Sequence, residues 1–260
     1  MGKLNALFRK KIGISQNEKI TFETLDHILE KTAETIPFEN LRVISNQVSD
    51  ITKDYLIDKI LVSNEGGLCY DLNTILYFFL AENGFNVSLF RGVIYDNAIQ
   101  DWITIGRTHV TILLTRDKHT YLIDTGFGVN LPLKPVPLSG GIVSSSNGEF
   151  RVNKMDSAHG DYNLELKLKH KDKDWKIGYT FDSSRAVRGG SELNEVQNII
   201  VKNPKSPFNK KPLIAKLTDL GSVTLTDTSF TQWIDGKIKK EEITDKEFKE
   251  IMKQYFGIEK

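Results

Sequence analysis

The hydrophobic repeat of this 260-residue chain changes its period twice, and that change limits the folds the chain can adopt. Residues 1–86 place apolar side chains three and four positions apart, which is the spacing of amphipathic helices. From Val87 onward, short segments alternate between apolar and polar side chains, as strands do. Both patterns occur after about residue 188. We therefore predict an α+β fold with an N-terminal helical bundle over 1–86, a central β-barrel over 87–187 and a C-terminal α/β lid over 188–260.

The helical part carries three predicted helices, and the third holds the only cysteine of the chain. Thr21 is placed to cap the first helix, whose apolar face is Phe22, Leu25, Ile28 and Leu29. The second helix is marked by Tyr55, Ile57, Ile60 and Leu61. The third is expected to begin near Gly67 and to end at Asn83-Gly84, which is a typical helix stop. Cys69 would then lie in its first turn.

The strands and helices of the middle and C-terminal parts are predicted from shorter segments of the sequence. The middle part is expected to contain strands at Val87–Tyr95, Val110–Leu114 and Tyr121–Ile123, and a hairpin that pairs Leu164–Leu168 with Trp175–Phe181. The last part is expected to contain a helix at Leu193–Val201, strands at Val223–Leu225 and Phe230–Ile234, and a helix opened by the capping box Thr244…Glu247.

Charge and hydropathy narrow the function. A formal charge of +1 and the absence of a long run of one sign argue against nucleic acid and lipid as partners. No apolar stretch approaches the roughly 20 residues that a membrane span needs, and no signal-peptide core is present. A single cysteine cannot form an internal disulfide. We expect a cytoplasmic protein that acts on small molecules, has no membrane part and keeps its cysteine reduced.

Cys69 is the candidate nucleophile. An isolated cysteine is commonly a small buried hydrophobe, so its surroundings have to support a chemical role. Gly66-Gly67 allows a tight turn just before it, and the helix that follows points its N-terminal amides at the sulfur. Such a position favours the thiolate, which is the reactive form.

A base for this thiol is sought among the five histidines. His109 heads an apolar strand, where the backbone fixes the direction of the imidazole, and the other four are expected to be surface or structural residues. Asp124 ends the next apolar run and precedes the turn Gly126-Phe127-Gly128. An aspartate at that place can hold His109 in one tautomer, although an aspartate there can also simply start a turn.

Five segments together resemble the arylamine N-acetyltransferases. Members of that family carry a PFENL-type segment, an RGG-x-C-x-x-x-N segment, a Thr-His pair, a DVGFG-type turn and a Ser-x-Phe segment. In this chain the matching stretches are Pro37–Leu41, Glu65–Asn73, Thr108-His109, Asp124–Gly128 and Ser206-Pro207-Phe208. The resemblance runs from the first helices to the closing residues 255–258.

The resemblance implies a fold of helical bundle, β-barrel and α/β lid with a Cys-His-Asp triad like that of cysteine proteases. It also implies a ping-pong acyltransferase reaction. Acetyl-coenzyme A would acetylate Cys69 and leave as coenzyme A, and an arylamine, arylhydroxylamine or hydrazine would then accept the acetyl group. Cys69 would be the nucleophile, His109 its base and Asp124 the orienting carboxylate. The role in the cell would be the metabolism of foreign compounds or a biosynthetic acylation.

The same resemblance suggests which residues surround the thiol. Phe38, Phe127 and Phe208 are expected to line a flat apolar pocket, although phenylalanines are commonly core residues. Coenzyme A is expected to contact Gly126, Gly128 and Ser206, and its nucleotide part to meet Trp233 and Lys239 in a basic segment that is otherwise a solvated face. No metal-ligand spacing and no nucleotide-binding glycine motif are present, so we expect no metal.

One position departs from the family pattern. Glu65 stands where relatives have arginine, and that arginine pairs with the glutamate that matches Glu39. The two carboxylates would then face each other unless Arg42, Arg91 or a lysine intervenes, and we favour such a replacement because uncompensated negative charge would oppose a thiolate.

Two other classes of function remain open at this stage. The same triad can serve an amide synthase, a cysteine hydrolase or a transglutaminase-like enzyme with another acyl donor. A homologue that binds ligand without turnover is also possible, and Glu65 is the feature that suggests it.

Overall fold

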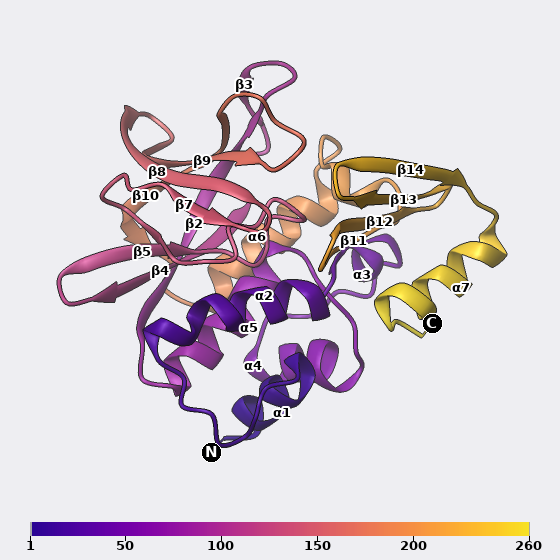
Figure 1. Ribbon diagram of the computed structural model, residues 1–260, viewed down its shortest axis with the longest axis horizontal. Helices are drawn as coiled ribbons and strands as arrows, with labels where there is room; N and C mark the ends of the chain where they lie inside the picture. Colours follow the sequence, from indigo (N-terminus) through magenta and orange to yellow (C-terminus); the bar gives the residue numbers. More distant parts are fainter. Residues whose placement is uncertain (1, 260) are drawn as a thin grey trace.

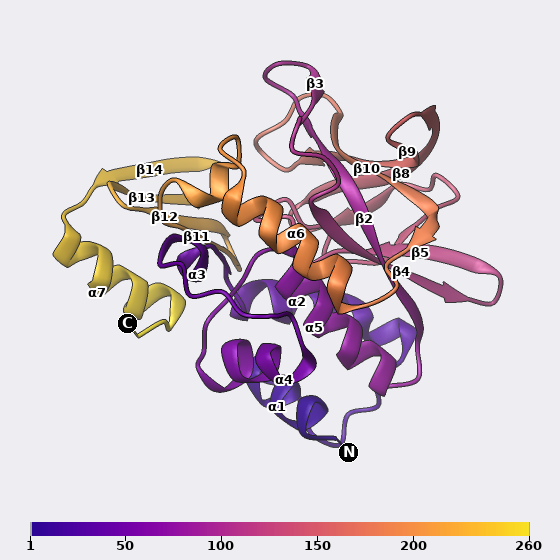
Figure 2. The ribbon, with the colours of Figure 1, turned by 180° about the vertical axis from the view of Figure 1, so that it is seen from behind.

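The computed structural model describes residues 2–259, which form three parts arranged around one junction. Figure 1 shows helices α1, α2, α4 and α5 at the bottom, the β-rich part above them, and strands β11–β14 with helix α7 beside both. The view from behind in Figure 2 shows helix α6 crossing between the β-rich part and the strands β11–β14. The three kinds of structure therefore follow the order that the periodicity predicts.

The N-terminal part is helical. Its helices are α1 (Lys3–Ile12), α2 (Leu25–Thr35), α3 (Leu41–Ile44), α4 (Lys53–Leu56) and α5 (Cys69–Glu82). A 3-10 turn at Phe22–Thr24 leads into α2, and a π-helical stretch at Ile57–Val62 continues α4. The apolar side chains expected from the helical spacing, such as Leu25, Ile28 and Leu29, are buried in the largest core cluster.

The middle part is a nearly closed barrel. Its strands run in the order β6-β5-β4-β2-β10-β9-β8-β7, with β3 paired to β2, and β6 also lies against β8. The bounds are β2 (Asn86–Asp96), β3 (Asp101–Trp102), β4 (His109–Arg116), β5 (His119–Ile123), β6 (Val136–Pro137), β7 (Val143–Ser145), β8 (Gly148–Ser157), β9 (Gly160–Leu168) and β10 (Lys176–Ala186). The predicted hairpin is confirmed, since Leu166 pairs with Lys176.

The last part combines one antiparallel sheet with helices. After α6 (Gly190–Lys202) and a 3-10 turn at Pro207–Asn209 come β11 (Leu213–Thr218), β12 (Gly221–Thr226), β13 (Ser229–Ile234) and β14 (Lys237–Glu242). Helix α7 (Asp245–Phe256) begins at the Thr244…Glu247 capping box that the sequence predicts. Met252 and Phe256 of α7 pack with Val223, Leu225 and Phe230 on one face of this sheet.

A short strand inside the helical part was not predicted. β1 (Phe38–Glu39) adds to the edge of the lid sheet by pairing with β11, so the segment before α3 joins the first and last parts of the chain. Asn40 strengthens the same joint, because its amide donates to the carbonyls of Phe208 and Lys211 and accepts from the N–H of Leu213. A two-residue strand is too short to produce a period of its own.

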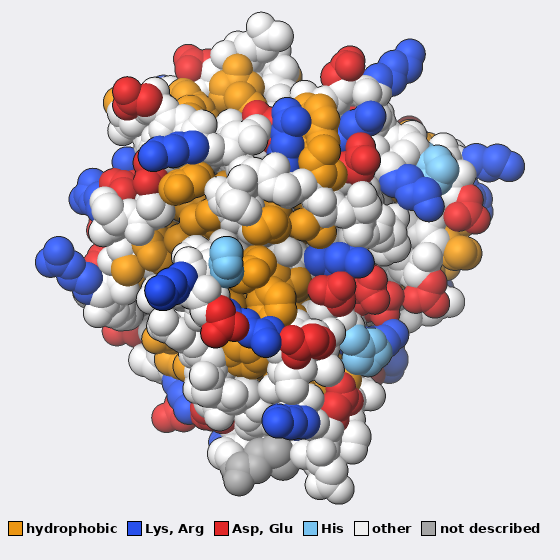
Figure 3. Space-filling model, turned by 60° about the vertical axis from the view of Figure 1, so that its left-hand side comes forward, with side chains coloured by type: hydrophobic (Ala, Val, Ile, Leu, Met, Phe, Trp, Pro, Cys, Tyr) orange, Lys and Arg blue, Asp and Glu red, His pale blue; other side chains and the backbone are white. Residues whose placement is uncertain are grey.

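The surface matches the balanced composition. The face in Figure 3 shows lysine and arginine side chains mixed with aspartate and glutamate, around apolar side chains near the centre. No helix within residues 2–259 combines the length and the apolar character needed to cross a bilayer.

Gly66 gives a test of how the loop before Cys69 is packed. A Cβ at Gly66 would lie 1.9 Å from the carbonyl oxygen of Pro37, which accepts a hydrogen bond from the N–H of Gly67. Gly66→Ala should therefore lower the free energy of unfolding by about 2 kcal/mol or more, as overpacking does. Gly189→Ala is the matched control, because nothing lies within 4 Å of its Cβ. Equal urea midpoints for the two variants would contradict this packing.

Candidate active site

Cys69 is the first residue of α5 and is 7% exposed. Its Sγ lies 3.4 Å from the carbonyl oxygen of Thr108, so the thiol faces the start of strand β4. The turn that begins α5 is held by Asp71, whose Oδ2 accepts from the N–H of Leu68 at 3.2 Å and from Lys59 Nζ at 2.7 Å. The prediction that Cys69 lies in the first turn of a helix is confirmed.

The predicted partners of the thiol lie beside it. His109 Nε2 is 2.7 Å from Asp124 Oδ2, and both residues are buried. Cys69 is close enough to His109 to contribute to the raised pKa of the imidazole. The structure thus brings Cys69, His109 and Asp124 together in the order nucleophile, imidazole and carboxylate.

The Asp124 carboxylate receives three further hydrogen bonds. Oδ1 accepts from Asn73 Nδ2 at 2.8 Å and from the N–H of Gly126 at 2.7 Å, and Oδ2 accepts from the Tyr179 hydroxyl at 2.7 Å. Burial opposes the charged carboxylate, but His109, Asn73 and Tyr179 outweigh it and hold the pKa of Asp124 below its usual value. A buried charge fully hydrogen-bonded in this way keeps its position and its ionisation.

The imidazole is correspondingly held in its charged form. Burial alone would lower the pKa of His109, but the attraction and hydrogen bond of Asp124 and the contact with Cys69 raise it to about 10. A protonated imidazole next to a thiol favours the thiolate through charge. Phe127 and Tyr179 pack on the ring, with centroid distances of 5.3 and 4.2 Å, and so restrict its rotation.

Asn73 couples the helix that carries the thiol to the barrel. Besides Asp124, its amide donates to the carbonyl of Val110 at 2.7 Å, and its Oδ1 accepts from the N–H of Thr125 at 2.9 Å. Asn73 lies one turn after Cys69 on α5. One buried side chain therefore fixes the distance between the α5 N-terminus and the strands that carry His109 and Asp124.

The thiol opens into an apolar cavity of about 320 Å³. The three phenylalanines expected from the sequence, Phe38, Phe127 and Phe208, all line it, and the rings of Phe38 and Phe208 meet edge to face at 5.6 Å. Further apolar walls were not anticipated from the sequence: Leu68, Ile94, Ile99, Trp102, Ile103, Ile105, Ile200 and Pro207. The volume and the apolar lining of the cavity suit an apolar ring.

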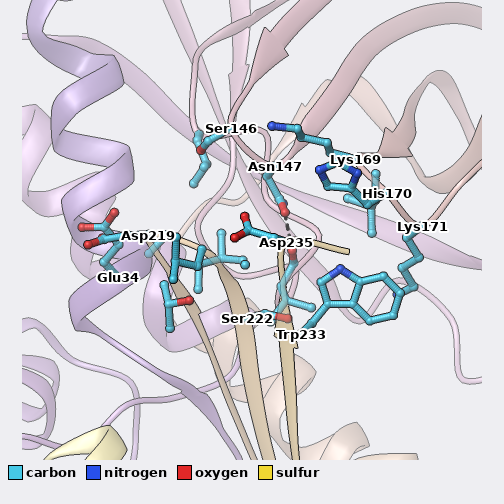
Figure 4. Close-up of a pocket in the computed structure, with 18 of the residues that line it drawn as sticks. Glu34, Ser146, Asn147, Lys169, His170, Lys171, Asp219, Ser222, Trp233 and Asp235 are labelled. Atoms are coloured by element: carbon cyan, nitrogen blue, oxygen red, sulfur yellow. Dashed lines mark hydrogen bonds between the residues drawn. The ribbon is translucent and has the colours of Figure 1, made fainter. Parts of the chain in front are cut away.

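A second cavity of about 360 Å³ lies between the barrel, α2 and the lid sheet. Figure 4 shows Trp233, His170 and Lys171 on one side of it, and Glu34 and Asp219 on the opposite side. Val129 lines this cavity, while Phe127, two residues earlier, lines the cavity at Cys69. The loop 126–129 therefore runs from one cavity to the other.

The remaining predicted contacts are placed as follows. Gly126 lines the Cys69 cavity, and a Cβ there would lie 2.6 Å from Cys69 Cα, so only glycine fits; Gly128 has φ +64 and open space around it. Ser206 is fully buried, and its hydroxyl accepts from the N–H of Phe208. Its observed contact is thus with the turn that presents Phe208.

Trp233 and Lys239 are not brought together. Trp233 pairs with Ile238 and Gln232 pairs with Lys239, so Trp233 and Lys239 project from opposite faces of the sheet. Lys239 forms an ion pair with Glu241 at 2.6 Å, on the side that α7 covers. The lysines beside Trp233 in the second cavity are Lys169 and Lys171, from the segment after β9.

The replacement expected at Glu65 is confirmed, and the cation is Arg42. Its Nε and NH2 groups donate to the two oxygens of Glu65 at 2.6 and 3.0 Å, which is a bidentate pair. Arg91, the other named arginine, instead pairs with Glu195 at 3.1 Å. Glu65 therefore does not leave the Cys69 loop with uncompensated negative charge.

Two residues of the site lay outside the sequence prediction. Tyr179 donates to Asp124, and burial raises the pKa of its hydroxyl, so that it keeps its proton. Lys59 supports the α5 N-terminus through Asp71. Tyr179 is far from Asp124 in the sequence, and Lys59 belongs to a different helix from Asp71. No local sequence pattern marks either residue.

Comparison with known proteins agrees with this geometry. The sequence model of a family described as N-acetyltransferase matches residues 21–259. An uncharacterized acetyltransferase of Bacillus subtilis (strain 168) is 39% identical over 248 residues, which are 95% of each chain. The crystal structure of an arylamine N-acetyltransferase from Bacillus cereus is 38% identical, with a TM-score of 0.95 and complete coverage of both chains.

More distant structures share the fold. An arylamine N-acetyltransferase of Mycobacterium marinum, solved in complex with CoA, is 22% identical and has a TM-score of 0.85 over 97% of this chain and 92% of its own. The fold and the site define an acyltransferase. More closely, the chain belongs to the N-acetyltransferase family. The Bacillus cereus protein is described as having a Cys-His-Glu triad, whereas the carboxylate at His109 here belongs to Asp124.

The charge state of His109 can be tested through the thiol. Below about pH 10 the imidazole is charged, and it loses its proton above that pH. Iodoacetamide should therefore label wild-type Cys69 roughly tenfold or more faster than His109→Gln at pH 6, with the two rates converging near pH 10. Cys69→Ala, which has no other cysteine, is the unreactive control. Equal rates at pH 6 would contradict a charged His109 that acts on the thiol.

The Arg42–Glu65 ion pair leads to a second prediction, which concerns the stability of variants at Glu65. Glu65→Arg places two guanidinium groups together, so the melting temperature should fall at both pH 5 and pH 8. The loss in free energy of unfolding should be about 2 kcal/mol or more, because one partner of a largely buried pair is removed. Glu65→Gln, which keeps the shape, should lose less. A gain confined to pH 8 would show instead that a carboxylate pair dominates this loop.

Proposed function

We propose that this protein is an arylamine N-acetyltransferase that carries the acetyl group on Cys69. The observation that carries the proposal is that Cys69 lies beside His109, which is hydrogen-bonded to Asp124, and that Cys69 and His109 line an apolar cavity. The donor is acetyl-coenzyme A, and the acceptor is an arylamine, arylhydroxylamine or hydrazine. The names of the Bacillus cereus relative and of the Mycobacterium marinum protein solved with CoA support both substrates.

In the first half-reaction, the Cys69 thiolate attacks the acetyl carbonyl of the donor. The carbon–sulfur bond to coenzyme A breaks, and His109 gives its proton to the departing thiolate, so coenzyme A leaves as a thiol. His109 is then neutral, and Cys69 carries a thioester. Splitting one amide-forming reaction into two exchanges lowers each barrier.

In the second half-reaction, the amine attacks the thioester carbonyl. Neutral His109 takes the proton that the amine loses, the bond to Cys69 breaks, and the thiolate and the imidazolium are restored. Asp124 remains ionised in both halves because of its donors, so it stabilises the charged imidazole and fixes its tautomer.

For the donor we propose a path along the loop 126–129. Gly128, which has open space around it, would let the pantetheine arm pass close to the backbone, and Gly126 would meet the arm where it lines the cavity at Cys69. Phe208 would lie on the other side, with Ser206 supporting the turn that carries its ring. The adenine would meet Trp233 and His170 in the second cavity (Figure 4). Its phosphates would meet Lys169 and Lys171, since Lys239 lies on the other face of the sheet. The single free thiol supports placement of the enzyme in the cytoplasm.

Intact-protein mass spectrometry tests the function. Wild-type protein mixed with acetyl-coenzyme A should gain the mass of one acetyl group at Cys69 and release one equivalent of coenzyme A. Addition of an arylamine should return the protein to its starting mass and yield the N-acetylated amine. Cys69→Ala should show none of these changes. A mass gain that persists in Cys69→Ala, or none in the wild type, would refute the thioester mechanism.

A further inference from the structure

Half of the arginines of this chain line one cleft between the barrel and α6. The chain has 27 lysines and eight arginines, yet the cleft, of about 860 Å³, is lined by four arginines and by no lysine. The four are Arg91, Arg107, Arg185 and Arg188. A guanidinium group offers a planar fork of donors that matches the oxygens of an anion, which an ammonium group does not. The composition of the cleft therefore indicates recognition of an anion.

The two glutamates of the cleft are already engaged. Glu195 accepts from both terminal nitrogens of the Arg91 guanidinium, at 3.1 and 3.4 Å. Glu192 accepts from the backbone N–H of Arg188 at 2.9 Å, near the start of α6. Four arginines against two glutamates leave the lining with two positive charges in excess.

Three guanidinium groups of the cleft have no carboxylate partner. Within residues 2–259, no carboxylate lies within ion-pair distance of Arg107, Arg185 or Arg188. The nearby acidic residue is Asp182, which the charges of Arg107 and Arg185 reach, but its carboxylate accepts from the N–H and the hydroxyl of Ser184. These three arginines are therefore available to a ligand.

The cleft lies beside the reaction site without being part of it. Its lining shares only Ile105 with the cavity at Cys69, and it shares no residue with the second cavity, where the nucleotide of the donor is proposed to lie. The segment 104–108 contributes side chains to the Cys69 cavity and to the cleft, and so forms a wall between them. A ligand in the cleft would thus leave the places of donor and acceptor open.

We propose that this cleft is a second ligand site, which binds a phosphorylated small molecule other than the acyl donor. A phosphate monoester carries about 1.5 to 2 negative charges at neutral pH and so matches the excess positive charge of the lining, whereas a carboxylate carries only one. The volume suits a molecule of about the size of a nucleotide.

The four arginines differ in how they would serve such a ligand. The Arg91 side chain is 15% exposed, and its Nε donates to the carbonyl of Arg107 at 3.0 Å, so this part of the wall is fixed. Arg185 and Arg188 are exposed, and their guanidinium groups would contact the phosphate from the solvent side. Their substitution therefore removes charge from the cleft without disturbing the core.

Calorimetric titration with inorganic pyrophosphate tests the site. The protein is first saturated with coenzyme A, so that the donor site is filled. Pyrophosphate should still bind the wild type, and Arg185→Met and Arg188→Met should each raise its Kd roughly fivefold, as for an exposed charge pair. The double variant should raise it by more than tenfold. Arg188→Lys, which keeps the charge but loses the fork of donors, should fall between Arg188→Met and the wild type.

Arg116→Met is the matched control, because Arg116 is an exposed arginine of β4 that does not line the cleft; its Kd should equal that of the wild type. An equal rise in Arg116→Met and Arg188→Met would reveal general charge attraction and overturn the proposal. So would the absence of pyrophosphate binding to the protein saturated with coenzyme A. If coenzyme A itself does not bind, the proposed function fails instead, and the same titrations without it still test the cleft.

Discussion

The buried carboxylate of Asp124 is the constraint on which the site depends. One ionised group deep in the protein must be hydrogen-bonded, and its donors come from separate parts of the chain: Asn73 on α5, His109 on β4, Tyr179 on β10 and the N–H of Gly126. All of these donors reach the Asp124 carboxylate only when α5 packs correctly against the barrel. The same contacts that meet the cost of burying the charge therefore place the imidazole against the thiol.

The three parts of the fold contribute different functions at their junction. The helical part supplies Cys69, the barrel supplies the imidazole and carboxylate, and the lid supplies Phe208 at the wall of the cavity. β1 and Asn40 connect the helical part directly to the lid, so the wall that meets the acceptor is tied to the segment beside the nucleophile. Changes of acceptor specificity can thus arise in the lid while the reacting groups stay unchanged.

Two ion pairs stabilise the loop before the nucleophile. Lys59–Asp71 anchors the start of α5, and Arg42–Glu65 holds the preceding turn. The family resemblance implies an arginine at position 65 that pairs with the glutamate matching Glu39, whereas here Glu65 pairs with Arg42. The physical requirement is a compensated charge at this place, and either arrangement meets it. Glu65 is therefore no reason to expect an inactive protein.

The sequence by itself determined the order of helical, β and mixed parts, the position of Cys69 at a helix N-terminus, and the candidates His109 and Asp124, because hydrophobic period and turn residues are local signals. Tertiary structure alone decided that Tyr179 reaches Asp124 and that Arg42 compensates Glu65, since these contacts join residues far apart in the chain. It also decided that Trp233 and Lys239 face opposite sides. The charged segment at 237–242 has no apolar alternation, so neither its strand nor its register was evident before β13 and β14 were seen to pair.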